Sequence, residues 1–176
     1  MIKQLISPRF ITLSIIIILA ALTRALPLFI PHIWNFTAVG ALAIFSGAQF
    51  RDNRLALIMP LAAMGLSDLF LGNGFSLVVY TGFLLMVICG ILIRNNKSIA
   101  NVVLASVSAA VVFYLFTNFA FFYPATTYPR NLAGITTSYI MAFPFLNNMI
   151  IGNLVYGSAL FGLFYILKNR YPVLAD

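Results

Sequence analysis

The chain has 176 residues, of which 62% are hydrophobic and only 7% are charged, and its mean hydropathy is +1.04. A soluble domain carries roughly 25% charged residues, so this composition excludes a water-soluble fold and predicts one all-α integral membrane domain over residues 1–176. The net charge of +7 does not indicate a nucleic-acid partner, because the ten Lys and Arg residues are scattered in ones and twos between apolar runs.

Six apolar segments follow one another along the chain, and each is expected to form a transmembrane helix. They cover residues 10–26, 35–50, 55–71, 75–93, 98–122 and 147–167. The apolar run from Phe10 to Leu22 in the first segment resembles a signal peptide, but Thr23 and Arg24 follow this run instead of a small-residue cleavage site, so we expect the segment to be retained. The second is shorter than the roughly 20 residues of a full span, which predicts a tilted helix or one that begins in the preceding loop.

The distribution of basic residues predicts the orientation of this six-helix bundle. One side receives eight Lys and Arg residues, whereas the other receives only Arg24 and Arg130. Because basic residues favour the cytoplasmic side, both termini are expected in the cytoplasm of a bacterial inner membrane. The eight residues on the cytoplasmic side are Lys3, Arg9, Arg51, Arg54, Arg94, Lys97, Lys168 and Arg170.

The longest connection, residues 123–146, contains three prolines and several aromatic residues but no long charged run. This composition is not typical of a disordered linker. It predicts a structured external lid with a short helix at the membrane interface over residues 131–143. Long ordered loops in compact domains are often functional.

Polar side chains from every segment gather in the half of the bundle that is predicted to be external. A binding pocket combines apolar walls with a few polar groups, and an ionisable residue at membrane depth marks a functional position by default. The sequence therefore predicts an outward-facing pocket for a small molecule. Its predicted ligand-binding residues are Arg24, His32, Trp34, Asp68, Tyr80, Asn118, Tyr128, Arg130 and Asn147.

Each of these residues also has a purely structural interpretation. Asp68 could form an internal ion pair with Arg24, and Arg24 could instead extend to the external headgroups. Trp34 is typical of the interfacial aromatic belt, and a single histidine such as His32 in a loop is usually solvated. The Tyr and Asn side chains could serve as interfacial anchors, helix caps or contacts between helices. The sequence leaves both interpretations open.

The sequence contains no catalytic or metal-binding motif. Three acids and one histidine are too few for a metal cluster or a hydrolase triad, and the chain has no P-loop with which to hydrolyse ATP. The single cysteine, Cys89, is expected near the cytoplasmic end of the fourth segment as a packing residue. We therefore predict no enzymatic activity, cofactor or metal. The alternatives to a binding protein are an accessory membrane subunit and a small membrane enzyme that acts on lipids.

Small residues recur at helical spacing in the first two segments, at Ala21 and Ala25 and at Gly40, Ala43 and Gly47. Such faces allow two helices to approach closely, either within the chain or against a partner helix. The sequence does not separate these two uses.

Three stretches of the chain carry a resemblance to a known family: WNFTAVGALA at residues 34–43, PLAAMGLSD at residues 60–68 and AFPF at residues 142–145. With six short helices and an external pocket in 19.4 kDa, the chain resembles the S components of energy-coupling-factor vitamin transporters. It is most similar to an uncharacterised S-component-like group of bacterial membrane proteins. The resemblance spans most of residues 35–162.

This resemblance implies a six-helix bundle that takes up a vitamin or related micronutrient with a membrane scaffold subunit and two ATPases. It also implies that Ala21 and Ala25 form the face that docks the scaffold. The family's cobalamin-binding members in Gram-negative bacteria are proposed to act alone and use a pocket cysteine as a cobalt ligand. Here Cys89 is expected at the opposite end from the pocket, which argues against a cysteine ligand. His32 is the only nitrogen ligand available. A cobalamin-type ligand is slightly preferred over other vitamins.

Overall fold

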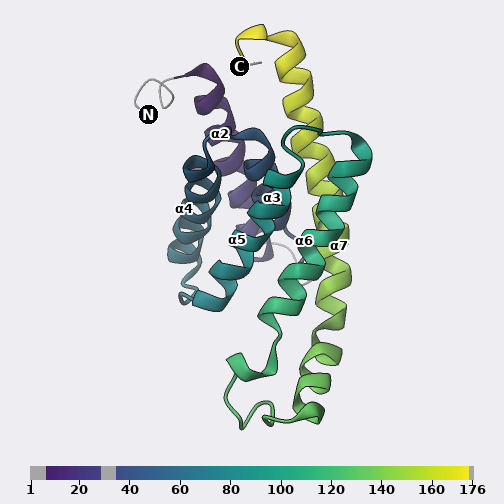
Figure 1. The fold of residues 1–176 in the computed structure, drawn as a ribbon. Coiled ribbons are helices and arrows are strands. Elements are labelled where there is room, and N and C mark those ends of the chain that lie inside the picture. Colours follow the sequence, from purple (N-terminus) through teal and green to yellow (C-terminus); the bar gives the residue numbers. More distant parts are fainter. Residues whose placement is uncertain (1–6, 29–34, 175–176) are drawn as a thin grey trace.

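The computed structural model describes residues 7–28 and 35–174, and this part of the chain is all-α (Figure 1). Four stretches are long and apolar enough to cross a membrane, as in a multi-pass membrane protein: Pro8–Ala25, Asn53–Leu71, Ile99–Thr117 and Leu132–Arg170. The six α-helices are α2 (Pro8–Leu22), α3 (Val39–Gln49), α4 (Asn53–Leu71), α5 (Leu77–Leu92), α6 (Ile99–Thr117) and α7 (Leu132–Arg170). Three short 3-10 helices accompany them: η1 (Thr23–Leu28), η2 (Ala120–Phe122) and η3 (Pro172–Leu174).

Helix α3 lies at the centre of the bundle and packs against α2, α4, α5, α6 and α7. All of its 11 residues are buried, as expected for a helix that is apolar on every side. A helix of 11 residues is only about 16 Å long, roughly half the thickness of the hydrocarbon core. The predicted second segment is therefore a short core helix. The prediction of six helices is confirmed, and four of the six have the length of a span.

The backbones of α3 and α5 cross in direct contact at two glycines. A Cβ atom on Gly47 would lie 2.2 Å from the carbonyl oxygen of Val87, and one on Gly90 would lie 2.1 Å from that of Ile44. No side chain fits at either position. The small residues of the second segment therefore serve packing within the chain.

Two arginines from outside α3 stabilise its carboxyl end. Arg9 Nη2 donates to the carbonyl oxygen of Gln49 at 3.0 Å, and Arg94 Nε donates to that of Gly47 at 3.1 Å. The last carbonyl groups of a helix lack partners within the helix and carry partial negative charge. Arg9 Nη1 also donates to the carbonyl oxygen of Leu174 at 2.9 Å. The start of α2 and the segment after α7 therefore lie at the same end of the molecule.

Helix α7 differs most from the sequence prediction. Residues 123–146 were expected to form an external connection with a short helix over 131–143, and a last span was expected at 147–167. That expectation is wrong, because α7 is one helix of 39 residues. Pro144 lies inside it, where it removes the N–H that would bond to the carbonyl oxygen of Ile140 and its ring crowds that carbonyl group. Apolar helices tolerate such a proline where neighbouring elements satisfy the polar backbone groups.

The pair of helices α6 and α7 extends well beyond the ends of α4 and α5 (Figure 1). At 39 residues α7 is about 58 Å long, nearly twice the thickness of the hydrocarbon core. Helix α6 ends at Thr117, five residues before the predicted end at 122, and η2 follows it. We call residues 114–146 the distal hairpin. It contains the true connection between the two helices, residues 118–131.

Candidate functional site

Arg24, Asp68 and Tyr80 form a partly buried polar cluster where η1, the end of α4 and the start of α5 meet. Asp68 Oδ1 lies 2.6 Å from Arg24 Nη2, and Asp68 Oδ2 accepts a hydrogen bond of 2.8 Å from the Tyr80 hydroxyl. Asp68 is only 6% exposed. Of the three acids in the chain, it is the one that lies within a described helix. The ion pair that the sequence predicts as one alternative is therefore present.

The turn after α4 holds the Asp68 carboxylate in place. Gly72 ends the helix in the left-handed conformation, with φ of 69°, which glycine adopts at little cost. The N–H groups of Gly72 and Asn73 both donate to the main-chain carbonyl of Asp68. The side-chain amide of Asn73 donates to Asp68 Oδ1 at a longer 3.3 Å. The carboxylate thus receives bonds from a guanidinium, a phenol and an amide.

Arg24 is held by α4 through two further bonds. Its Nη1 atom donates to Ser67 Oγ at 2.6 Å and to the carbonyl oxygen of Met64 at 3.2 Å. The Ser67 hydroxyl itself donates to the Met64 carbonyl at 2.8 Å. The guanidinium therefore joins η1 to the last turns of α4. Ser67 was not among the predicted site residues, although it lies directly before Asp68.

Four of the predicted ligand-binding residues lie away from this cluster. The Asn118 amide donates to the carbonyl oxygen of Tyr114 at 2.9 Å and so caps α6, and the Tyr128 ring packs on Tyr123 with centroids 5.4 Å apart. These contacts stay within the distal hairpin. Arg130 is exposed in the α6–α7 connection and Asn147 is exposed on α7. Among the residues that the structure describes, the predicted set therefore forms separate groups. His32 and Trp34 lie outside the described residues.

The predicted docking residues differ in their surroundings. Ala21 is 8% exposed and belongs to the hydrophobic core, whereas Ala25 is half-buried in η1, beyond the end of α2. Cys89 is half-buried and packs against the core, as expected for a packing residue.

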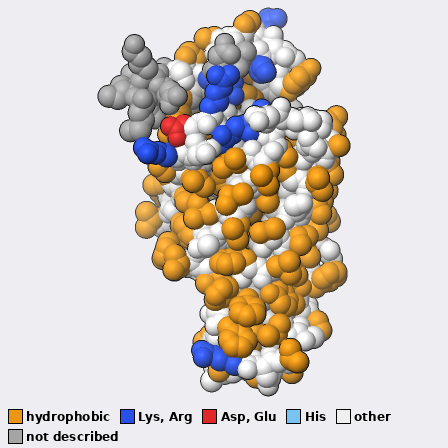
Figure 2. Space-filling model, viewed as in Figure 1, with side chains coloured by type: hydrophobic (Ala, Val, Ile, Leu, Met, Phe, Trp, Pro, Cys, Tyr) orange, Lys and Arg blue, Asp and Glu red, His pale blue; other side chains and the backbone are white. Residues whose placement is uncertain are grey.

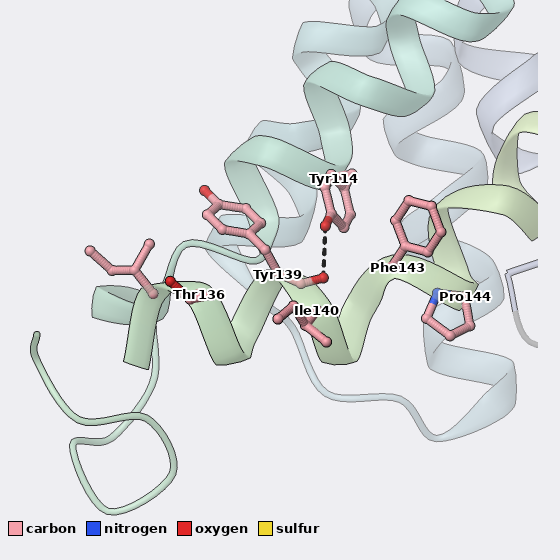
Figure 3. A pocket seen from close by; sticks show the side chains of 7 residues that line it. Tyr114, Thr136, Tyr139, Ile140, Phe143 and Pro144 are labelled. Carbon is pink, nitrogen blue, oxygen red and sulfur yellow. Dashed lines mark hydrogen bonds between the residues drawn. The ribbon is translucent and has the colours of Figure 1, made fainter. Parts of the chain in front are cut away.

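A groove of about 590 Å³ runs along the distal hairpin between α6 and α7. Figure 3 shows its lining, in which carbon surfaces predominate. This groove was not predicted, because residues 123–146 were expected to form a loop. The sequence nevertheless carries a helical pattern here, because the lining residues between 135 and 144 recur at intervals of four, as on one face of a helix. The lining residues are Tyr114, Ile135, Thr136, Tyr139, Ile140, Phe143 and Pro144.

The tyrosine hydroxyls beside the groove satisfy main-chain carbonyl groups of the two helices. Tyr114 donates to the carbonyl oxygen of Tyr139 at 2.7 Å, which Figure 3 shows as a dashed line, and Tyr139 donates to that of Leu115 at 2.7 Å. Tyr123 donates to that of Thr117 at 3.0 Å. The last carbonyls of α6 need such partners because the helix ends at Thr117. These hydroxyls therefore stabilise the hairpin, and the groove is essentially an apolar surface.

No group of three or more His, Cys, Asp or Glu side chains could hold a metal ion within residues 7–28 and 35–174. The polar cluster offers one carboxylate, one phenol and one guanidinium. These groups can bind a polar ligand group through hydrogen bonds and charge.

The chain belongs to a family of unknown function, DUF6580, whose model matches residues 4–174. No curated protein and no solved structure matches the chain. The family description names no activity, so the resemblance to energy-coupling-factor S components stays a prediction.

Proposed function

We propose that the chain is a membrane-embedded binding protein for uptake of a small molecule, and that Arg24, Asp68 and Tyr80 bind the ligand's polar group. The observation that carries this proposal is the burial of Asp68, at 6% exposure, in an ion pair within an apolar bundle. A well-packed apolar pair is often as stable as a buried ion pair. Retention of the charged groups therefore favours a role beyond stability.

A polar group of the ligand can replace one of the hydrogen-bond donors that the Asp68 carboxylate has within the chain. The Asn73 amide makes the longest contact to the carboxylate, at 3.3 Å, so a ligand amine or hydroxyl can replace it while the ion pair persists. The Arg24 side chain is 18% exposed, and this exposed part can meet a carboxylate or phosphate of the ligand. A vitamin or related micronutrient carries such groups. The resemblance to S components favours this class, with a cobalamin-type ligand first.

The proposal places both termini in the cytoplasm and the polar cluster toward the outside of a bacterial inner membrane. The support is the concentration of basic residues at the end where α2 begins and α7 ends. In a Cys89→Ala background, a membrane-impermeant maleimide should label Thr126→Cys in intact spheroplasts. It should label Asn95→Cys only after lysis. Both positions are exposed, and the reverse pattern would exclude this orientation.

The binding proposal predicts that one compound in a panel of vitamins, cobalamin included, raises the Tm of the purified protein. At a ligand concentration 100 times the Kd, the stabilisation is about 2.7 kcal/mol, which corresponds to a shift of roughly 5–10 °C for a chain of this size. Asp68→Asn and Tyr80→Phe should each reduce this shift strongly, because each removes a group that binds the ligand.

The matched control is Asp52→Asn, which changes an acid at the opposite end of α4. Asp52 caps that helix through the N–H of Arg54, and asparagine is an equally good cap, so its shift should equal that of the unaltered protein. If no compound in the panel raises the Tm, the binding proposal is refuted. It is also refuted if Asp68→Asn and Tyr80→Phe both show the full Tm shift.

Because the resemblance to S components also implies an energy-coupling-factor scaffold subunit and two ATPases, they belong to this proposal as partners. Docking at Ala21 and Ala25 would use the half-buried Ala25 and the exposed Leu22 between them. Co-purification of a scaffold with the unaltered chain, and its loss in Ala25→Trp, would support that interface. A chain that transports the ligand without any ATPase would act alone.

A second candidate function is an accessory membrane subunit. It is favoured by the fact that both carboxylate oxygens of Asp68 already have partners within the chain. In that case the variants of the cluster change stability and assembly, and no compound in the panel binds.

A further inference from the structure

Basic side chains from several elements gather at the end of the bundle where α2 begins and α7 ends. Figure 2 shows Lys and Arg above a wide apolar belt, with acidic side-chain surface beside them. Partial burial lowers the pKa of Lys97, and the positive charges of Arg9, Lys168, Arg94 and Arg51 lower it further. Hydrogen bonds join three of these residues directly: Arg94 Nη1 donates to the carbonyl oxygen of Arg51 at 3.0 Å, and Lys97 Nζ donates to the carbonyl oxygen of Arg94. The five residues therefore lie close together, with the other four near enough to act on Lys97. We call them the basic cluster.

Few acidic groups are present to balance this charge. Asp52 is the one acid that the described residues contribute at this end, and its charge acts on Arg94. Arg9 and Arg94 also donate to carbonyl groups at the end of α3, but a carbonyl group carries no net charge. Among the described residues at this end, five cations therefore face one acid, and an anion would stabilise this excess of positive charge.

Exposed apolar side chains lie directly beside the basic cluster. Leu92 is 79% exposed and Ile99 is 85% exposed, and they flank the turn that carries Arg94 and Lys97. A soluble anion would use only the charges. A phospholipid has a phosphate for the cations and acyl chains for the apolar side chains, so this combination favours a lipid.

We propose that the basic cluster is a binding site for the headgroup of an anionic phospholipid such as phosphatidylglycerol or cardiolipin. The phosphate binds at Lys97 and Lys168, and an acyl chain lies along Leu92 or Ile99. Arg9 and Arg94 keep their bonds to α3 and contribute charge. The site is separate from the polar cluster at Asp68, so it does not depend on the proposed function.

The test is native mass spectrometry of the delipidated full-length protein, with phosphatidylglycerol, cardiolipin and phosphatidylcholine as probes. A basic residue near an anionic headgroup contributes about fivefold in affinity. The double variant Lys97→Gln with Lys168→Gln should therefore bind the two anionic lipids roughly 30-fold more weakly. Lys97→Arg with Lys168→Arg keeps both charges and should bind within a few-fold of the unaltered chain. Arg130→Gln removes a cation at the opposite end and should bind normally.

Three results would overturn the proposal. They are equal binding of phosphatidylcholine, unchanged binding of anionic lipid in the Gln double variant, and full displacement of bound lipid by millimolar glycerol phosphate. The last result would identify a site for soluble anions. The Tm of the Gln double variant in detergent controls for folding, and the Arg double variant separates lost charge from lost structure if that Tm falls.

Discussion

Gly90→Ala is expected to destabilise the bundle by about 3 kcal/mol, at the upper end of the usual cost of overpacking a core. The added Cβ atom would lie 2.1 Å from the carbonyl oxygen of Ile44. Because the obstacle is backbone, no side-chain rotation can relieve it. Helices α3 and α5 must separate instead, and α3 is the helix that contacts all the others. The measurement is the free energy of unfolding in mixed detergent micelles.

Two further glycine variants test whether the crossing itself is the cause. Gly47→Ala meets the carbonyl oxygen of Val87 at 2.2 Å and should cost a similar amount. The same helix displacement would relieve both clashes, so the double variant should cost less than the sum. Gly162→Ala is the control, since no atom lies within 4 Å of its added Cβ. It should be neutral or stabilise α7 by about 0.5–1 kcal/mol. Equal stability of Gly90→Ala and Gly162→Ala would refute the close crossing.

Asp68→Ala is expected to destabilise the protein by about 3–5 kcal/mol, because it leaves the Arg24 guanidinium buried without its counter-charge. It also removes the acceptor of the Tyr80 hydroxyl. Arg24→Met combined with Asp68→Leu removes both charges and fills a similar volume. Such an apolar pair is often as stable as the ion pair it replaces, so the double variant should recover most of the lost stability. A double-mutant cycle on the free energy of unfolding measures this coupling.

The same double variant separates the two candidate functions. If the polar cluster binds a ligand, the double variant should remain folded. The compound that stabilises the unaltered chain should then not shift the Tm of this variant. If the chain is an accessory subunit, the double variant should assemble normally. A double variant as unstable as Asp68→Ala alone would show that the ion pair is not the source of the loss.

Local signals in the sequence predict where most helices begin. Four helices start after a Ser or Asp whose side chain accepts a bond from a main-chain N–H of the first turn, namely α2, α4, α5 and α6. Asn131 does the same for α7. Each capping residue lies only two or three residues before the N–H group that it accepts from, so the cap needs no tertiary contact. The predicted starts of the first, third, fourth and fifth segments are accordingly within two residues of the structure.

The site was predictable in part. Arg24, Asp68 and Tyr80 stand out as polar groups in apolar segments, and the structure brings them together. Asn118 and Tyr128 stand out for the same reason but serve the distal hairpin. Polarity alone does not say which side chains meet, because the meeting depends on how the helices pack.

The composition and charge pattern of the chain are enough to predict an apolar helical membrane protein with its cations concentrated at one end. The packed structure was needed to show that the second segment is a core helix, that α7 continues through Pro144, and that the Asp68 carboxylate pairs with Arg24. The physical reason is that lipid and protein interior are both apolar surroundings. An apolar run has the same composition whether lipid or other helices surround it, so its partner becomes known only when the helices are packed.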